Sequence, residues 1–156
     1  MQESEVFKMS NNIKNRQSAE ILQAVYRNSQ MAYEASSDVL KHCKNNMLFR
    51  EISREKERYK NVAAQAKSEL AKRNVAAEEV APFGKMMSKM GIAVKTAANQ
   101  SGHNIAKIMV QGTTMGIIDM QHAVNRSHNA DPRIRESAER LLQREQEYCE
   151  SLKKYL

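Results

Sequence analysis

The chain has 156 residues, which is enough for one domain with a buried core. It contains 5 glycines, 2 prolines and no tryptophan, and it has no run of alternating β-branched residues, so the composition predicts an all-α fold. The net charge of +7 is interspersed with carboxylates and lacks the interleaved aromatic residues that stack on bases, which argues against a nucleic-acid partner.

The amino-terminal segment, residues 1–12, shows no helical period and is predicted to be a flexible tail. It is polar and has no apolar core of the secretory type, and no stretch of the chain approaches the ~20 apolar residues of a membrane span. These features predict a cytoplasmic protein with a single helical bundle domain over residues 13–156.

The first long helix is predicted over residues 13–44. Apolar and small residues recur there at spacings of three and four, which is the pattern of a buried helix face. They are Leu22, Val25, Ser29, Ala32, Ser36, Val39 and Cys43. The small residues in the middle of this face favour close approach by a neighbouring helix.

The second helix is predicted over residues 46–73, with Asn45 or Asn46 as its N-cap. A short loop between two long helices makes them antiparallel. The apolar face of this helix is unusual because Glu55 lies in its middle. The residues on the face are Leu48, Ile52, Glu55, Tyr59, Val62, Ala66 and Leu70.

The next segment is predicted to form a helical crossover over residues 82–98, starting at Pro82. Its methionines and lysines would also suit a membrane surface or the groove of a partner protein. We favour the crossover, because methionine fills irregular gaps well when a helix lies on its own bundle.

The third and fourth helices are predicted over residues 103–127 and 131–155. Asp131 is a favourable N-cap, and Pro132 suits the first helical position. The fourth helix repeats the pattern of the second, because Glu145 also follows an arginine within an apolar face. Two buried carboxylates on different helices are typical of a metal site.

Three stretches resemble the ferritin-like bundles of the rubrerythrin type: NSQMAYEAS (28–36), REKERYKNVA (54–63) and LLQREQEYCESLKKYL (141–156). The stretch IAKIMVQGTTMGIIDMQHAV (105–124) also resembles part of an uncharacterised, clostridial-type bacterial family. The resemblance implies a ferritin-like four-helix bundle with a long helical crossover between helices two and three. It also implies a di-iron site built from one Glu on the first helix of each half and Glu-x-x-His on the second.

Most of the ligands that the resemblance implies are missing from this chain. The Glu of the third helix would fall between residues 113 and 118, where there is no carboxylate, and both histidine positions hold other residues. The vestigial ligand positions are Asn28, Glu55, Arg58, Glu145 and Tyr148. We therefore expect a non-enzymatic structural or interaction protein without a cofactor and with no catalytic residues. Its expected partners are other proteins, including further copies of the chain as a homo-oligomer.

The retained carboxylates are expected to find donors within the protein. Arg58 supplies a fixed positive charge for Glu55, and Tyr148 can donate a hydrogen bond to a carboxylate. Arg58→Ala is therefore expected to destabilise the fold by roughly 3–5 kcal/mol, because it leaves a buried carboxylate without its partner.

An alternative hypothesis keeps a reduced metal site. Asp119 and His122 are three residues apart near the inner face of the third helix, and they could join Glu55 and Glu145 around one iron or zinc ion. The protein would then be a metal-binding or redox bundle. Because His122 lies near the end of its helix, where a cation is favourable without any metal, we favour the metal-free hypothesis.

Overall fold

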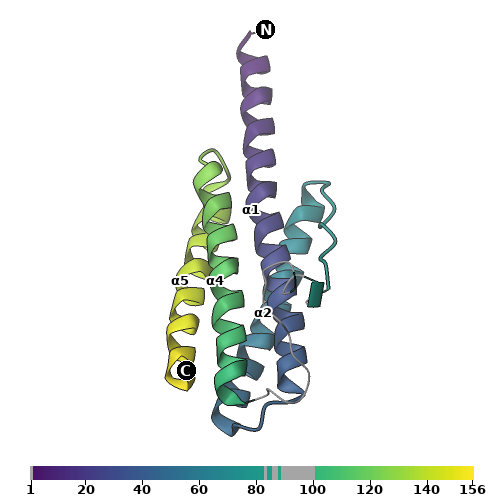
Figure 1. The fold of residues 1–156 in the computed structure, drawn as a ribbon. Coiled ribbons are helices and arrows are strands. Elements are labelled where there is room, and N and C mark those ends of the chain that lie inside the picture. The colour runs from purple at the N-terminus through teal and green to yellow at the C-terminus, as the bar shows by residue number, and fades with distance from the viewer. Residues whose placement is uncertain (1, 83, 86–87, 89–100) are drawn as a thin grey trace.

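A computed structural model describes residues 2–82, 84–85, 88 and 101–156. These residues form four long helices, α1 (Gln2–Leu40), α2 (Asn46–Lys72), α4 (Gly102–Arg126) and α5 (Pro132–Leu152), followed by the short 3-10 helix η2 (Lys153–Tyr155) (Figure 1). The prediction of an all-α chain is confirmed for the described ranges. Within them, no helix combines the length and the apolar character that crossing a membrane requires. The predicted helix over residues 82–98 lies mostly outside the described residues.

Helix α1 begins at Gln2, so the predicted boundary between a tail at 1–12 and a helix from residue 13 is wrong. Residues 2–16, here called the N-terminal arm, are all exposed and project beyond the bundle (Figure 1). They form a helix that is polar apart from a few exposed apolar side chains, and the short apolar period did not reveal it. Glu3 and Glu5 lie in the first turn, where negative charge favours a helix.

The ends of the helices follow local sequence signals. The side chain of Asn45 accepts hydrogen bonds from two backbone amides of the first turn of α2, both at 3.0 Å. Asp131 caps α5, and Pro132 follows it. These predicted caps are confirmed. Asn74 ends α2 with a φ of 58°, in the left-handed region that asparagine tolerates better than most residues.

Contacts at one end of the bundle fix the directions of the helices. Gly102, at the start of α4, lies beside Asn45 and Leu48 at the start of α2. His103 also lies close to the C-terminus, with its Nδ1 3.2 Å from the carbonyl oxygen of Leu156. Helices α2 and α4 therefore run in the same direction, and α1 and α5 run in the opposite one (Figure 1). The main packing contacts join α1 to α2, α4 to α5 and α1 to α4.

Among the residues that the structure describes, the core contains two apolar clusters. One lies near the turn between α4 and α5 and includes Ile21, Leu22, Leu70, Val124 and Leu142. The other lies near the start of α2 and includes Leu48, Ile52, Ile105, Met109 and Leu152. Glu55 and Glu145 are buried beside these clusters, and they are the charged side chains among the buried polar residues of the described ranges.

Candidate functional site

Glu55 is held by an arginine from its own helix. One guanidinium nitrogen of Arg58, Nη1, donates to both carboxylate oxygens, at 2.6 Å from Oε2. The side chain of Glu55 is 6% exposed and that of Arg58 is 35% exposed, so the pair spans the boundary between core and solvent. Arg144 of α5 adds a second positive charge, with its Nε 3.7 Å from Glu55. The predicted Arg58–Glu55 ion pair is confirmed.

Glu145 receives its donor from the facing helix. The hydroxyl of Tyr59 on α2 donates to Oε2 of Glu145 at 2.8 Å. The other carboxylate oxygen, Oε1, has no hydrogen bond within the described part of the chain. Burial raises the pKa of Glu145 to about 7; the hydrogen bond from Tyr59 opposes this rise, and the nearby charge of Glu55 adds to it. Glu145 is therefore a carboxyl group that is close to half protonated at neutral pH.

The predicted hydrogen bond from Tyr148 to a carboxylate is wrong. The Tyr148 hydroxyl is buried and has no hydrogen-bond partner among the described residues. Its ring instead packs edge-on against Tyr59, with the ring centroids 6.4 Å apart and the planes at 71°. Tyr59 reaches Glu145 from across the bundle, so the carboxylate has a donor without Tyr148. Burial raises the pKa of both phenols, so both keep their protons.

A second polar group joins α1 to α4. Asn28 donates to Oδ2 of Asp119 at 2.8 Å, and Arg27 donates to the same oxygen through Nε at 3.1 Å and Nη2 at 2.7 Å. Arg27 also pairs with Glu78 at 2.9 Å. Sequence reasoning missed Arg27, because its role depends on which helix lies against α1. Asn28, a predicted vestigial ligand position, thus contacts a carboxylate one residue beyond the range 113–118.

The alternative four-residue metal site is not assembled. His122 is exposed on α4, and Asp119 is engaged by Arg27 and Asn28. Glu55 and Glu145 each have a donor from the protein. In the ranges that the structure covers, no group of three or more His, Cys, Asp or Glu side chains is arranged to hold a metal ion.

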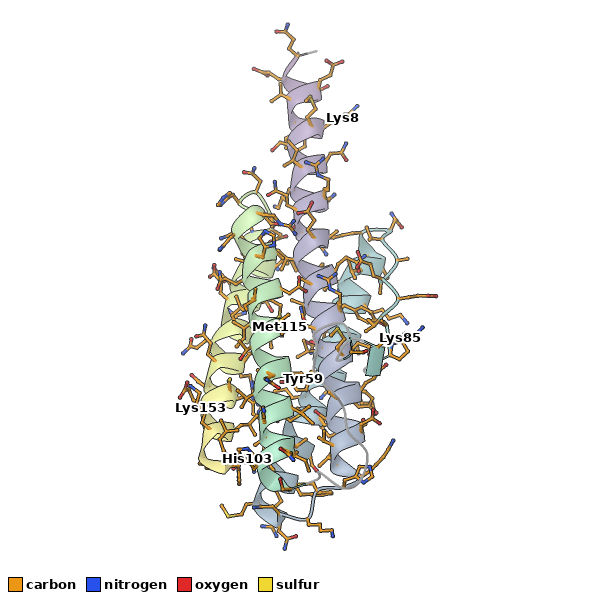
Figure 2. The ribbon with its side chains drawn as sticks, viewed as in Figure 1. Lys8, Tyr59, Lys85, His103, Met115 and Lys153 are labelled. Carbon is orange, nitrogen blue, oxygen red and sulfur yellow. The ribbon has the colours of Figure 1, made fainter. Side chains whose placement is uncertain are left out.

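A cavity of about 360 Å³ lies between α1 and α4 and extends inward to α2 and α5. Tyr59 and Glu145 line its inner part, and Met115, which is 46% exposed, lies at its outer part; Tyr59 and Met115 are labelled in Figure 2. Most of the lining is apolar, and the carboxylates on it are Asp119 and Glu145. The apolar lining residues include Met31, Ala32, Ile108, Met109 and Met120.

The two glycines of α4 lie differently against this cavity. A Cβ atom on Gly112 would meet nothing within 4 Å, whereas a Cβ on Gly116 would lie 3.3 Å from Oδ1 of Asn28. Gly116 therefore permits close contact with α1, whereas Gly112 faces open space. Gly112 leaves space that a side chain could fill.

Gly112→Ala is expected to stabilise the protein by about 0.5–1 kcal/mol, because alanine loses less backbone entropy in a helix and meets no neighbour. Gly116→Ala is the matched control: its new methyl group would press on Asn28, which holds Asp119, so its gain should be smaller or negative. Urea denaturation of both variants measures the difference. Equal changes in the free energy of unfolding for the two variants would contradict the conclusion that Gly112 faces open space and Gly116 does not.

No protein-family model, curated protein or solved structure matches the chain. A proposal for its function must therefore be based on the residues of this chain. Three carboxylates in or beside the core, Glu55, Asp119 and Glu145, each accept hydrogen bonds from donors within the protein. The site can thus balance most of its charge without a bound cation, and it borders a cavity large enough for a small molecule.

Proposed function

We propose that the chain is a non-enzymatic, ferritin-like bundle whose metal-ligand positions are held by internal contacts, and that it assembles with a second copy through the N-terminal arm. The parallel directions of α2 and α4 support the ferritin-like part of this proposal, because such helices need a connection that crosses the length of the bundle. A helical crossover over residues 82–98 would provide that connection.

The arrangement of the polar residues also supports this lineage. In ferritin-like carboxylate proteins, two helices each give one carboxylate, and the other two each give a carboxylate with a histidine three residues later. Here α1 and α4 meet through Asn28 and Asp119. Helices α2 and α5 each carry a glutamate with another polar residue three positions later. These pairs are Glu55–Arg58 and Glu145–Tyr148. We infer that the chain is a member of an uncharacterised bacterial family and that it has lost most of the metal ligands of ferritin-like proteins.

The observation that carries the interaction role is the N-terminal arm. Val6, Met9 and Ile13 are 65%, 63% and 37% exposed, and their spacing of three and four residues places them on one face of the helix. Phe7, on another side, is also exposed. A lone helical segment of this length is only marginally stable in water. Large apolar side chains gathered on it are typical of a protein–protein contact.

The charges on the arm favour a second copy in antiparallel orientation. Glu5 and Arg16 are eleven residues apart, close to three helical turns, so they flank one edge of the face formed by Val6, Met9 and Ile13. Glu3 and Lys14 have the same spacing and flank the other edge. An antiparallel copy would bring Glu5 toward Arg16 and Glu3 toward Lys14 at both edges. The arm is therefore complementary to itself.

The assembly can be tested by size-exclusion chromatography with light scattering. We expect the full chain to be a dimer at tens of micromolar concentration and the double variant Val6→Glu/Met9→Glu to be a monomer, because four glutamates would then face one another across the pair. Ser4→Glu/Asn11→Glu adds the same charge on the opposite side of the arm and should remain a dimer. A monomeric full chain at high concentration, or equal effects of the two double variants, would contradict the proposal.

A further inference from the structure

The cavity between α1 and α4 has the size and lining of a small-molecule site. Its volume of about 360 Å³ is within the ~300–1,000 Å³ typical of such sites, and it exceeds the ~150 Å³ that can hold a benzene ring. Four methionines, Met31, Met109, Met115 and Met120, line it. Methionine side chains adapt readily to the shape of an apolar ligand.

The charge at the inner end of the cavity is unbalanced. Of the two carboxylates in the lining, Asp119 is already paired with Arg27 at 2.7 Å. Glu145 accepts only the neutral hydroxyl of Tyr59, and its Oε1 has no hydrogen bond within the described ranges. The charge of Arg58 also acts on Glu145, but the guanidinium of Arg58 donates its hydrogen bonds to Glu55. A bound cation would therefore find its partner at Glu145.

We propose that this cavity binds a small hydrophobic amine, with the ammonium group at Glu145 beside the ring of Tyr59 and the hydrocarbon part among the methionines. The ammonium ion supplies donors and a charge for the free oxygen of Glu145, and the face of a tyrosine ring also attracts cations. Burying the hydrocarbon part against the apolar walls removes apolar surface from water, which makes the free energy of binding more favourable. This site does not depend on assembly through the N-terminal arm.

Other ligand classes fit this cavity less well. A carboxylic acid or phosphate would be repelled by Glu145, and a neutral alcohol would leave the carboxylate charge uncompensated in an apolar site. A bare metal ion needs several oxygen, nitrogen or sulfur ligands around it, whereas most of this lining is hydrocarbon and thioether. An amine matches both the charge and the walls.

The test compares hexylamine with hexan-1-ol, which has a similar shape and no charge. Both are titrated into the full chain at pH 8 and followed by NMR amide shifts along α4. At this pH the amine is protonated, and Glu145, whose pKa is about 7, is mainly ionised. We expect saturable shifts centred on Gly112 and Gly116, and binding of the amine at least tenfold tighter than binding of the alcohol.

Three variants assign the site. Gly112→Leu fills the cavity and should weaken binding of both compounds at least tenfold, whereas Gln121→Leu adds the same side chain at an exposed position of α4 and should change neither. Glu145→Gln should keep binding of the alcohol and remove the preference for the amine. If Gly112→Leu does not fold, the preference for the amine over the alcohol in Glu145→Gln, compared with that of the unmodified chain, still tests the proposal. Equal binding of amine and alcohol by the unmodified chain, absence of saturable binding, or an unchanged preference in Glu145→Gln would overturn the proposal.

Discussion

Glu145→Gln is expected to make the protein more stable than the unmodified chain at pH 8, and this advantage should shrink as the pH falls toward 5. The pKa of Glu145 rises from an ordinary value of 4.5 to about 7 in the folded protein. Folding therefore favours its protonated form. The stabilising contribution of that proton is complete below about pH 4.5 and is lost as the pH rises through about 7.

The size of the effect follows from the pKa shift. A difference of about 2.5 pKa units corresponds to about 3 kcal/mol between the two ends of this pH range. Glu145 is only 6% exposed, so solvent screening reduces this figure little. Glutamine has the shape of the protonated acid and can still accept the hydrogen bond from Tyr59. It carries no charge to be buried at high pH.

Urea denaturation at pH 5, 6, 7 and 8 measures this difference. The groups that face Glu145 are Tyr59, Glu55 and Arg58 of α2 and Tyr148 of its own helix, and they are the same in both proteins, so their titration largely cancels in the comparison. Glu147→Gln, at an exposed position two residues away, controls for the loss of one negative charge. If the advantage of Glu145→Gln is the same at all four pH values, Glu145 is not a buried acid with a raised pKa.

The parts of the structure that the sequence predicted depend on local patterns. Helical spacing alone placed Glu55 and Glu145 on buried faces, and both are buried, at 5% and 6% exposure. The Asn45 and Asp131 caps depend on bonds to amides two or three residues away. The ion pair between Glu55 and Arg58 is also local, because residues three apart share a face of a helix.

The parts that the sequence did not predict depend on how the helices are placed against one another. Whether Tyr59 or Tyr148 reaches Glu145 is decided by the offset between α2 and α5, and the pattern on each helix does not contain that offset. Arg27 meets Asp119 only because α1 lies against α4. The open space beside Gly112 also depends on helix packing, because the side chains of the neighbouring helices determine whether it is filled.

The N-terminal arm shows another limit of sequence periodicity. A helix is recognised in a sequence by the apolar stripe that it buries. Within residues 2–16 only Val6, Met9 and Ile13 have this spacing, and three positions in an otherwise polar stretch make a period too short to identify a helix. The apolar residues of the arm become meaningful once the structure shows that they share an exposed helical face.

Arg58→Ala is expected to destabilise the protein by about 1–3 kcal/mol at pH 7, because it leaves the carboxylate of Glu55 buried without its main donor. This is less than the ~3–5 kcal/mol expected for a fully buried pair. The side chain of Arg58 is 35% exposed, so solvent already screens part of the interaction. Arg144, whose Nε lies 3.7 Å from Glu55, can replace part of the lost charge.

Denaturant unfolding of a double-mutant cycle tests this account. The second change, Glu55→Gln, removes the charge that needs a partner, so Glu55→Gln/Arg58→Ala should recover most of the stability lost in Arg58→Ala. Arg54→Ala removes an exposed arginine one turn away on the same helix and should change the free energy of unfolding by less than about 0.5 kcal/mol. If Arg58→Ala is as mild as Arg54→Ala, Glu55 is balanced by Arg144 or by water. The ion pair with Arg58 would then not be what stabilises the buried carboxylate of Glu55.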